Sequence, residues 1–297
     1  MRKLRTIPAL LMLPLAVACA PSGEAPKSAP PAPKEPLAAL TEALAAGQVS
    51  VIDLTQTLNE KTPVIRLPPP FANTPGLEKH LLSRYDAKGP AWYWNYLTVG
   101  EHAGTHFDAP CHWISGKDKA CVDQIPADRF VGPAAVIDAT AEVAKNPDFV
   151  VSRQTLLDWE RKHGRIPARA WVILRSGWDA RASDAKAFLN VGADGRPHYP
   201  GFGLESAQFL SQERDVLGVG TEAIGTDAAV GAGAQPPFPN HFTMHGAGKF
   251  GITQLANVGS LPPTGAIVIA TPLKVEGGSG SPVHAIALVA AAAAAAR

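Results

Sequence analysis

The sequence has few cysteines, no long apolar run and no excess of either charge. Three cysteines among 297 residues are too few for a small domain held together by several disulfides. No apolar stretch reaches the roughly 18 residues that a membrane-spanning helix needs. The formal net charge of +1 provides no basic surface for a nucleic acid. We therefore expect a globular protein whose partners include neither a nucleic acid nor a bilayer that it spans.

Composition and periodicity indicate one mixed α/β domain over residues 37–297. Hydrophobic residues make up 46% of the chain, enough for a large core, while 27 glycines and 28 prolines predict many turns. Helical and extended patterns alternate along the middle of the chain, as in α/β proteins. We expect helices over 37–46, 154–163 and 204–212, and strands over 51–55, 91–97, 170–174, 216–219, 266–270 and 285–289. Residues 56–90, rich in proline, glycine and charge, predict a long irregular excursion.

The first 18 residues have the pattern of a signal peptide. Three of the first five are basic, the apolar stretch 7–15 is too short to span a bilayer, and small residues occupy 16–18. Cys19 follows, as in a bacterial lipoprotein, where this cysteine is lipidated. Ala16 stands where that motif usually has leucine, so ordinary cleavage stays open. We expect an exported protein, either periplasmic or anchored to the membrane as a lipoprotein.

Residues 19–36 predict a disordered tether before the domain. The segment 21–36 contains six prolines and no large apolar side chain, so it cannot bury enough surface to fold. Such a tether would hold the domain away from a membrane. A lipid on Cys19 would then be the contact between the protein and the bilayer.

Two further cysteines, Cys111 and Cys121, belong to the domain. An oxidising compartment permits a disulfide between them. The separation of ten residues does not fix their geometry, so both the disulfide and the free thiols stay open. A zinc site using the adjacent Cys111 and His112 is a weaker alternative.

The strongest chemical signal lies in residues 101–112. His106 and Asp108 are two residues apart, so in an extended segment both side chains leave the same face. His102 precedes Gly104, which permits a turn tight enough to bring a second imidazole to the same point. Two imidazoles and one carboxylate suit Zn²⁺, Mn²⁺ or Fe²⁺ and leave positions open for water. His112 lies close by outside this trio and is our candidate general acid/base.

The pattern His-x-Gly-Thr-His-x-Asp-x-Pro-x-His resembles the signature of the cyclase family of metal-dependent hydrolases, which includes kynurenine formamidases and isatin hydrolases. Similarity extends over most of the domain, in segments 51–55, 172–178, 198–201, 218–227, 256–262 and 272–282. The resemblance implies a swivelling β/β/α fold with a β-barrel-like core. It also implies hydrolysis of a small amide, lactam or lactone, by an arylformamidase-like or isatin hydrolase-like enzyme.

The resemblance also assigns roles. His102, His106 and Asp108 would be metal ligands, and His112 would be the catalytic acid/base. Members with two metals use a later histidine, matched here by His241, and a glutamate twelve residues further on. At that distance this chain has Thr253, followed by Gln254, whose amide oxygen is a substitute donor; His284 replaces a usual arginine. We therefore predict one divalent ion, Zn or Mn, per chain, and expect His245 to be a neighbour of the site rather than a ligand.

Four aromatic residues flank the motif: Trp92, Trp94, Phe107 and Trp113. They predict either a pocket for an aromatic small-molecule substrate or ordinary core packing. Phe107, between two ligands in an extended segment, should point away from the metal. Resemblance to the family further implies a homo-oligomer.

A surface lipoprotein that binds a metal or small ligand without turnover is the alternative function. The substitutions at Thr253 and His284 favour it, whereas the presence of His112 beside a full ligand trio favours an enzyme. A purely structural role in assembly has no support, because the sequence contains neither heptads nor repeats.

Overall fold

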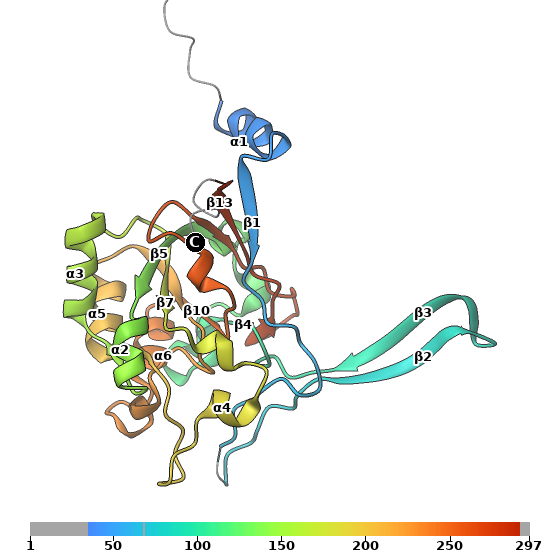
Figure 1. Ribbon diagram of the computed structural model, residues 1–297. Helices are drawn as coiled ribbons and strands as arrows, with labels where there is room; N and C mark the ends of the chain where they lie inside the picture. Colours follow the sequence, from blue (N-terminus) through green and yellow to red (C-terminus); the bar gives the residue numbers. More distant parts are fainter. Residues whose placement is uncertain (1–34, 68, 292–297) are drawn as a thin grey trace, which may run out of the picture.

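The computed structural model describes residues 35–67 and 69–291, whose body is built around one sheet of nine strands (Figure 1). The predicted signal peptide, Cys19 and the tether up to residue 34 lie outside the described residues. In order across the sheet, the strands are β1 (Val49–Asp53), β13 (Ile286–Ala290), β11 (Ile267–Ile269), β5 (Val131–Asp138), β7 (Ala170–Arg175), β9 (Val216–Thr221), β10 (Phe250–Thr253), β4 (His106–Asp108) and β12 (Gly280–Pro282).

The centre of this sheet is parallel and its flanks are antiparallel. Strands β5, β7, β9 and β10 pair in parallel, which requires crossover segments between them. The flanking pairs on both sides, from β1 to β5 and from β10 to β12, are antiparallel. The sheet curls into a half-barrel, which confirms the predicted mixed α/β domain with a barrel-like core.

Strand β7 shows why the sheet has an apolar core on each face. A strand buried on both faces sends alternate side chains to opposite sides. Val172 and Leu174 join a core that contains residues of the helices, whereas Trp171 and Ile173 join a second core enclosed by the curled sheet. All four are fully buried. Phe107 also belongs to the second core, directly beneath the predicted metal site.

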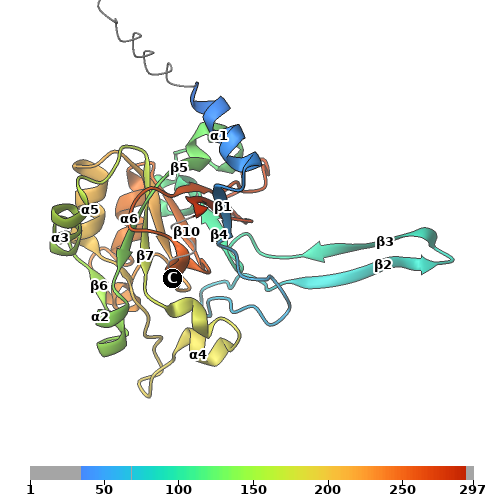
Figure 2. The same cartoon turned by 45° about the horizontal axis from the view of Figure 1, so that its top comes forward.

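Helices cover the first face of the sheet, where α3 (Arg153–His163) and α5 (Leu204–Gln212) lie side by side in Figures 1 and 2 and α2 (Thr140–Lys145) contributes Val143 to the same core. Helix α3 follows Ser152, whose Oγ accepts a hydrogen bond from the backbone N–H of Thr155, and ends at Gly164 with φ +86°. The helices predicted over 154–163 and 204–212 are thus confirmed. The helices are α1 (Pro36–Ala45), α2 (Thr140–Lys145), α3 (Arg153–His163), α4 (Ala185–Leu189), α5 (Leu204–Gln212) and α6 (Pro239–Gly246).

A long two-stranded arm projects from this body (Figures 1 and 2). It consists of β2 (Glu78–Asp86) and β3 (Gly89–Thr98), which pair antiparallel across a short turn. The expectation of irregular structure over 56–90 is therefore wrong for residues 78–86 and 89–90. Their mixed polar and apolar pattern gives little sign of a strand, which exists because β3 pairs with it. A further short parallel pair joins β6 (Val150–Val151) to β8 (Gly201–Phe202).

Cys111 and Cys121 form a disulfide with their Cα atoms 5.2 Å apart. This finding decides the question that the spacing left open and rules out Cys111 as a zinc ligand. The bridge fastens the short 3₁₀ helix η1 (Pro110–His112) to the loop that precedes η3 (Val122–Gln124). Among the residues that the structure describes, no helix is both long and apolar enough to cross a bilayer.

Candidate active site

Strand β4 presents His106 and Asp108 on one face and Phe107 on the other. The strand lies between β10 and β12, so its backbone is paired on both sides and its three residues are buried. Phe107 packs against Phe130 and Phe250, with ring centroids 5.5 and 5.2 Å away. Phe107 therefore points away from the predicted metal site, as expected, and its ring packs in the second core on the opposite side of β4 from the two ligands.

A tight turn returns His102 to the same place. Gly104 has φ +63°, a left-handed conformation that other residues adopt at a cost. The imidazole then packs over Gly280 of β12, where an added Cβ would lie 2.5 Å from His102 Cε1. The chain therefore needs glycine at both positions to bring His102 beside His106 and Asp108.

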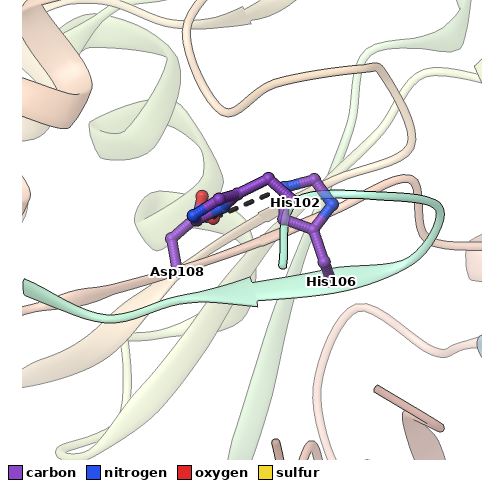
Figure 3. Close-up of side chains that lie close together, drawn as sticks. All are labelled: His102, His106 and Asp108. Atoms are coloured by element: carbon purple, nitrogen blue, oxygen red, sulfur yellow. Dashed lines mark hydrogen bonds and ion pairs between the residues drawn. The ribbon is translucent and has the colours of Figure 1, made fainter. Parts of the chain in front are cut away.

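His102, His106 and Asp108 converge as the sequence predicted (Figure 3). His102 Nδ1 lies 2.8 Å from Asp108 Oδ1, and His106 Nε2 lies 3.4 Å from the same oxygen. Burial raises the pKa of Asp108, but the nearby imidazoles more than offset it and keep this pKa well below the usual range. The carboxylate is therefore ionised at neutral pH.

Hydrogen bonds on the far side of each ring fix which nitrogen faces the centre. His106 Nδ1 donates to the Gly104 carbonyl at 2.7 Å, which leaves a lone pair on Nε2. The Ser279 hydroxyl donates to Glu101 at 2.6 Å, so it accepts from His102 Nε2 at 2.9 Å. A neutral His102 therefore directs the lone pair of Nδ1 at the Asp108 carboxylate. Two imidazole nitrogens and a carboxylate oxygen directed at one point are a donor set that fits a divalent metal ion.

His112 lies next to this group without belonging to it. Its ring stacks on that of His102 with centroids 3.9 Å apart, and it lies 5.8 Å from the ring of His241. Burial lowers the pKa of His112 to about 2, so the imidazole is neutral near pH 7 and carries a lone pair on one ring nitrogen. The structure thus places the predicted acid/base at the edge of the predicted metal site.

Helix α6 brings two more imidazoles to Asp108. His241 and His245, one turn apart, lie with Asp108 in a second buried group whose ligand atoms are within 4.8 Å of one another. Burial favours neutral His241, but its hydrogen bond to Asp227 outweighs this effect and raises its pKa. Burial lowers the pKa of His245 to about 4. His245, expected as a neighbour of the site, thus lies in this second group beside His241.

Thr253 and Gln254, at the position of the missing glutamate, lie on the other side of the centre. The Thr253 hydroxyl is 3.1 Å from Nδ1 and 3.2 Å from Nε2 of His106, so it lies beside that ring. The side-chain nitrogen of Gln254 donates to the Pro63 carbonyl at 3.3 Å. Both residues are buried and line the same cavity as the histidines.

The ligand groups form the polar floor of a cavity of about 280 Å³. Trp113 contributes to its wall, as predicted, with its ring 4.8 Å from that of His241. The prediction fails for Trp92 and Trp94, which lie on the arm with exposed side chains. The rest of the apolar wall comes from segments far from the motif in sequence, which no local pattern predicted: Ile65, Leu67, Tyr199, Ile224 and Phe238.

A curled α/β sheet carrying a buried His/Asp cluster beneath an apolar cavity defines a metal-dependent hydrolase. The chain belongs to the cyclase family, whose model matches residues 52–228. It is 46% identical over 256 residues to an isatin hydrolase of Roseibium aggregatum, covering 85% of this chain and 97% of that protein. It is 27% identical over 197 residues to a kynurenine formamidase of Salinibacter ruber, covering 64% of this chain and 77% of that protein.

Solved structures of isatin hydrolases also resemble this chain. Isatin hydrolase A from Ralstonia solanacearum superposes with a TM-score of 0.83 at 47% identity, covering 88% of this chain and all of that one. Isatin hydrolase A from Labrenzia aggregata, bound to benzyl benzoate, gives 0.83 at 48% identity, covering 86% and all of the two chains. The family resemblance predicted from the sequence is therefore confirmed.

Proposed function

We propose that this protein opens the ring of a small aromatic lactam of the isatin type by hydrolysing its amide C–N bond. The observation that carries the proposal is the placement of His102, His106, Asp108 and His112 on the floor of an apolar cavity. The isatin hydrolases that it resembles support a lactam, and their structures hold aromatic molecules, benzyl benzoate and thioisatinate. Trp113 and Phe238 would contact the aromatic ring of the substrate.

His102, His106 and Asp108 would hold a divalent cation, Zn or Mn, with His241 and Gln254 as the further predicted donors. When bound, such a cation supplies Lewis acidity, which polarises a carbonyl and lowers the pKa of water from ~16 toward ~7. The side-chain nitrogen of Gln254 donates to the Pro63 carbonyl, so the amide oxygen would be the atom of Gln254 that contacts the cation.

His112 would carry the proton. Addition of a water oxygen to the lactam carbonyl carbon, followed by cleavage of the C–N bond, yields a carboxylate, an aromatic amine and one proton that is released to solvent. During these two steps His112 would accept a proton from the water and return it to the leaving nitrogen. Its contact with His102 places it within the cavity beside the ligand trio, where both transfers occur.

The test is hydrolysis of isatin, followed by its absorbance, with full-length protein loaded with Mn or Zn. We expect turnover that a chelator abolishes and either metal restores. N-formylkynurenine and a simple lactone serve as comparison substrates, because the resemblance to kynurenine formamidase is the second candidate for specificity. Failure of the metal-loaded protein to hydrolyse any of the three would contradict the proposal and favour a protein that binds without turnover.

We further propose that the protein is a homo-oligomer joined through its arm. Eight large apolar side chains of the arm are 42–68% exposed and amount to roughly 800–1,000 Å², which matches the ~800 Å² that each partner buries in a stable interface. An isolated two-stranded hairpin is only marginally stable in water, so burial of these side chains against another surface would stabilise the arm. The arm of a second copy of this chain offers such a surface in a symmetric interface. The eight side chains are Leu81, Leu82, Tyr85, Trp92, Tyr93, Trp94, Tyr96 and Leu97.

We also propose that the protein is exported, to the periplasm or as a lipoprotein. The Cys111–Cys121 disulfide supports an oxidising compartment. Mass spectrometry of the N-terminal peptide of protein from a bacterial host tests this proposal. A diacylglyceryl group on Cys19 would establish the anchored form, cleavage without lipid the periplasmic form, and an intact Met1 would contradict export.

A further inference from the structure

We propose that a second cavity, separate from the active site, binds a small organic anion, a carboxylate on an apolar or aromatic body, through Arg129 and Lys119. This cavity has a volume of about 340 Å³ and, among the residues that the structure describes, no lining residue in common with the active-site cavity. It lies where η1, the 3₁₀ helix η4 (Ala127–Phe130) and the turn from α6 to β10 meet. Its lining consists of Pro110, Lys119, Ala120, Ile125, Pro126, Arg129, Gly248 and Phe250.

The guanidinium of Arg129 is the first sign of an anionic ligand. Its Nε is buried without a hydrogen-bond partner, and the group forms no ion pair, among the residues that the structure describes. The adjacent carboxylate of Asp128 is engaged instead by Arg169, at 2.9 Å. A buried polar atom of a charged group is costly to leave unpaired, so native structures seldom retain one without a function. Arg129 is therefore placed to hold a negative charge that the chain itself does not supply.

The aromatic ring of Phe250 helps to position this guanidinium. Arg129 Cζ lies over the ring, 5.5 Å from its centroid. A guanidinium against an aromatic ring keeps its N–H groups, which lie in its own plane, available to an acceptor. A carboxylate matches them with two parallel hydrogen bonds. The arrangement therefore favours a carboxylate over an acceptor with a single oxygen.

The charged groups that line the cavity are both positive. Lys119 is the second, and its ammonium forms no ion pair within the described part of the chain. Lys249 lies close by: burial lowers its pKa, Asp215 at 3.7 Å from its Nζ partly opposes this effect, and the charge of Arg129 adds to the lowering. An anion in the cavity would therefore be attracted by two lining cations and a neighbouring third.

The remaining lining is apolar, which defines the rest of the ligand. Ile125 and Phe250 are buried, and Pro110, Ala120 and Pro126 complete this part of the wall. An inorganic anion would leave these side chains without a contact, whereas the body of an aromatic or branched carboxylate would cover them. Small-molecule sites commonly have volumes of roughly 300–1,000 Å³, so the cavity suits a ligand at the small end of that range.

The disulfide holds one wall of the cavity in place. Lys119 and Ala120 lie within the loop that the Cys111–Cys121 bridge closes. The backbone N–H of Cys111 also donates to the Ala120 carbonyl, at 3.4 Å, across this loop. A wall that is fixed before the ligand arrives reduces the entropy lost on binding.

The experiment measures the affinity of para-fluorobenzoate for the full-length, Zn-loaded protein by fluorine NMR. We expect saturable binding that Arg129→Gln weakens about tenfold or more, because the guanidinium binds both carboxylate oxygens. Lys119→Gln should weaken it less, since this side chain is exposed. Arg165→Gln is the matched control, at an exposed arginine that lines neither cavity, and should bind as the wild type does. The neutral para-fluorobenzamide, which has nearly the same shape, should bind about tenfold more weakly.

Four outcomes would overturn the proposal. Wild-type protein without saturable binding refutes it, and this measurement requires no variant to fold. Equal affinity of the wild type and Arg129→Gln would place the carboxylate elsewhere, as on the bound metal. Equal affinity for the benzamide would show that charge plays no part, and displacement by an equal concentration of inorganic phosphate would give the cavity to an inorganic anion. Because no hydrolysis is measured, failure of the proposed function leaves this test unaffected.

Discussion

The rings of His102 and His112 stack at a centroid distance of 3.9 Å, so a predicted ligand and the predicted acid/base touch directly. His112 is nevertheless absent from both groups of converging donors. Metal binding and proton transfer are thereby assigned to neighbouring but different imidazoles, and a substitution at His112 can separate them.

Replacement of His112 by alanine should lower kcat for the hydrolysed substrate by ~10² or more and leave the metal content unchanged. The physical reason is loss of the group that moves the proton while His102, His106 and Asp108 remain. Metal analysis and steady-state kinetics on the same preparation check this result. His163→Ala, an exposed histidine on α3, serves as the control. Loss of metal together with activity would instead make His112 a ligand.

Removal of the disulfide with the double variant Cys111→Ser and Cys121→Ser should destabilise the protein. A bridge that closes a loop of this length contributes about 2–3 kcal/mol to the free energy of unfolding, through restriction of the unfolded chain. Urea unfolding followed by circular dichroism measures the difference. Wild-type protein in strong reductant should unfold at the urea concentration of the double variant. An unchanged midpoint in both cases would show that the bridge contributes nothing.

Replacement of Glu160 by glutamine should change how stability depends on acid. Hydrogen bonds from Arg214 at 2.7 and 2.6 Å, aided by the backbone N–H of Ile166, lower the pKa of Glu160 below its ordinary 4.5. A lowered pKa in the folded state adds stability that is complete above pH 4.5 and is lost as the pH falls through the folded value.

The wild type should therefore exceed Glu160→Gln in free energy of unfolding by about 1–3 kcal/mol at pH 7, and the difference should shrink as the pH falls below 4.5. Chemical unfolding at several pH values provides the measurement. Glu205→Gln, at an exposed position in the first turn of α5, should remain parallel to the wild type throughout. A constant difference between wild type and Glu160→Gln at all pH values would contradict the assignment.

Charged substitutions on the arm should dissociate the oligomer. Leu97→Asp combined with Trp94→Asp places two charges among side chains that are 58% and 54% exposed in the single chain. Burial of an unpaired carboxylate in the interface is costly, so the double variant should run as a monomer in light scattering. Leu273→Asp, at a body residue 65% exposed, is the control and should keep the assembly of the wild type. A wild-type protein that is already monomeric would refute the interface.

The first ligand group could be predicted because it is local. Seven residues, 102–108, contain all three donors, and the period of an extended strand together with a glycine turn is enough to align them. The position of His245 beside Asp108 was more difficult to predict, because it depends on the packing of α6 against β4, two segments some 140 residues apart in the sequence. The same holds for Ile65 and Tyr199, whose place in the cavity wall follows from topology and not from any local pattern.

The two strands of the arm show a second reason why parts of the fold could not be predicted from the sequence. Segment 91–97 reads as a strand because aromatic residues favour extended structure, but that pattern does not show whether the strand is buried in a core or stands in a projecting hairpin. Strand β2 could not be predicted from its own residues, since the pairing with β3 decides its conformation. In the same way β5, interrupted by Gly132 and Pro133, becomes recognisable as a strand only beside β7 and β11.

The connection between β1 and β2 contributes Ile65 and Leu67 to the cavity wall before the chain enters the arm. One end of this connection is strand β1 of the nine-stranded sheet, and the other end is strand β2 of the arm, whose apolar side chains are exposed in the single chain. A contact that fixes the position of the arm would therefore also fix Ile65 and Leu67, against which the substrate would lie. In the proposed oligomer, KM should therefore depend on the enzyme concentration and should rise on dilution, when the subunits separate.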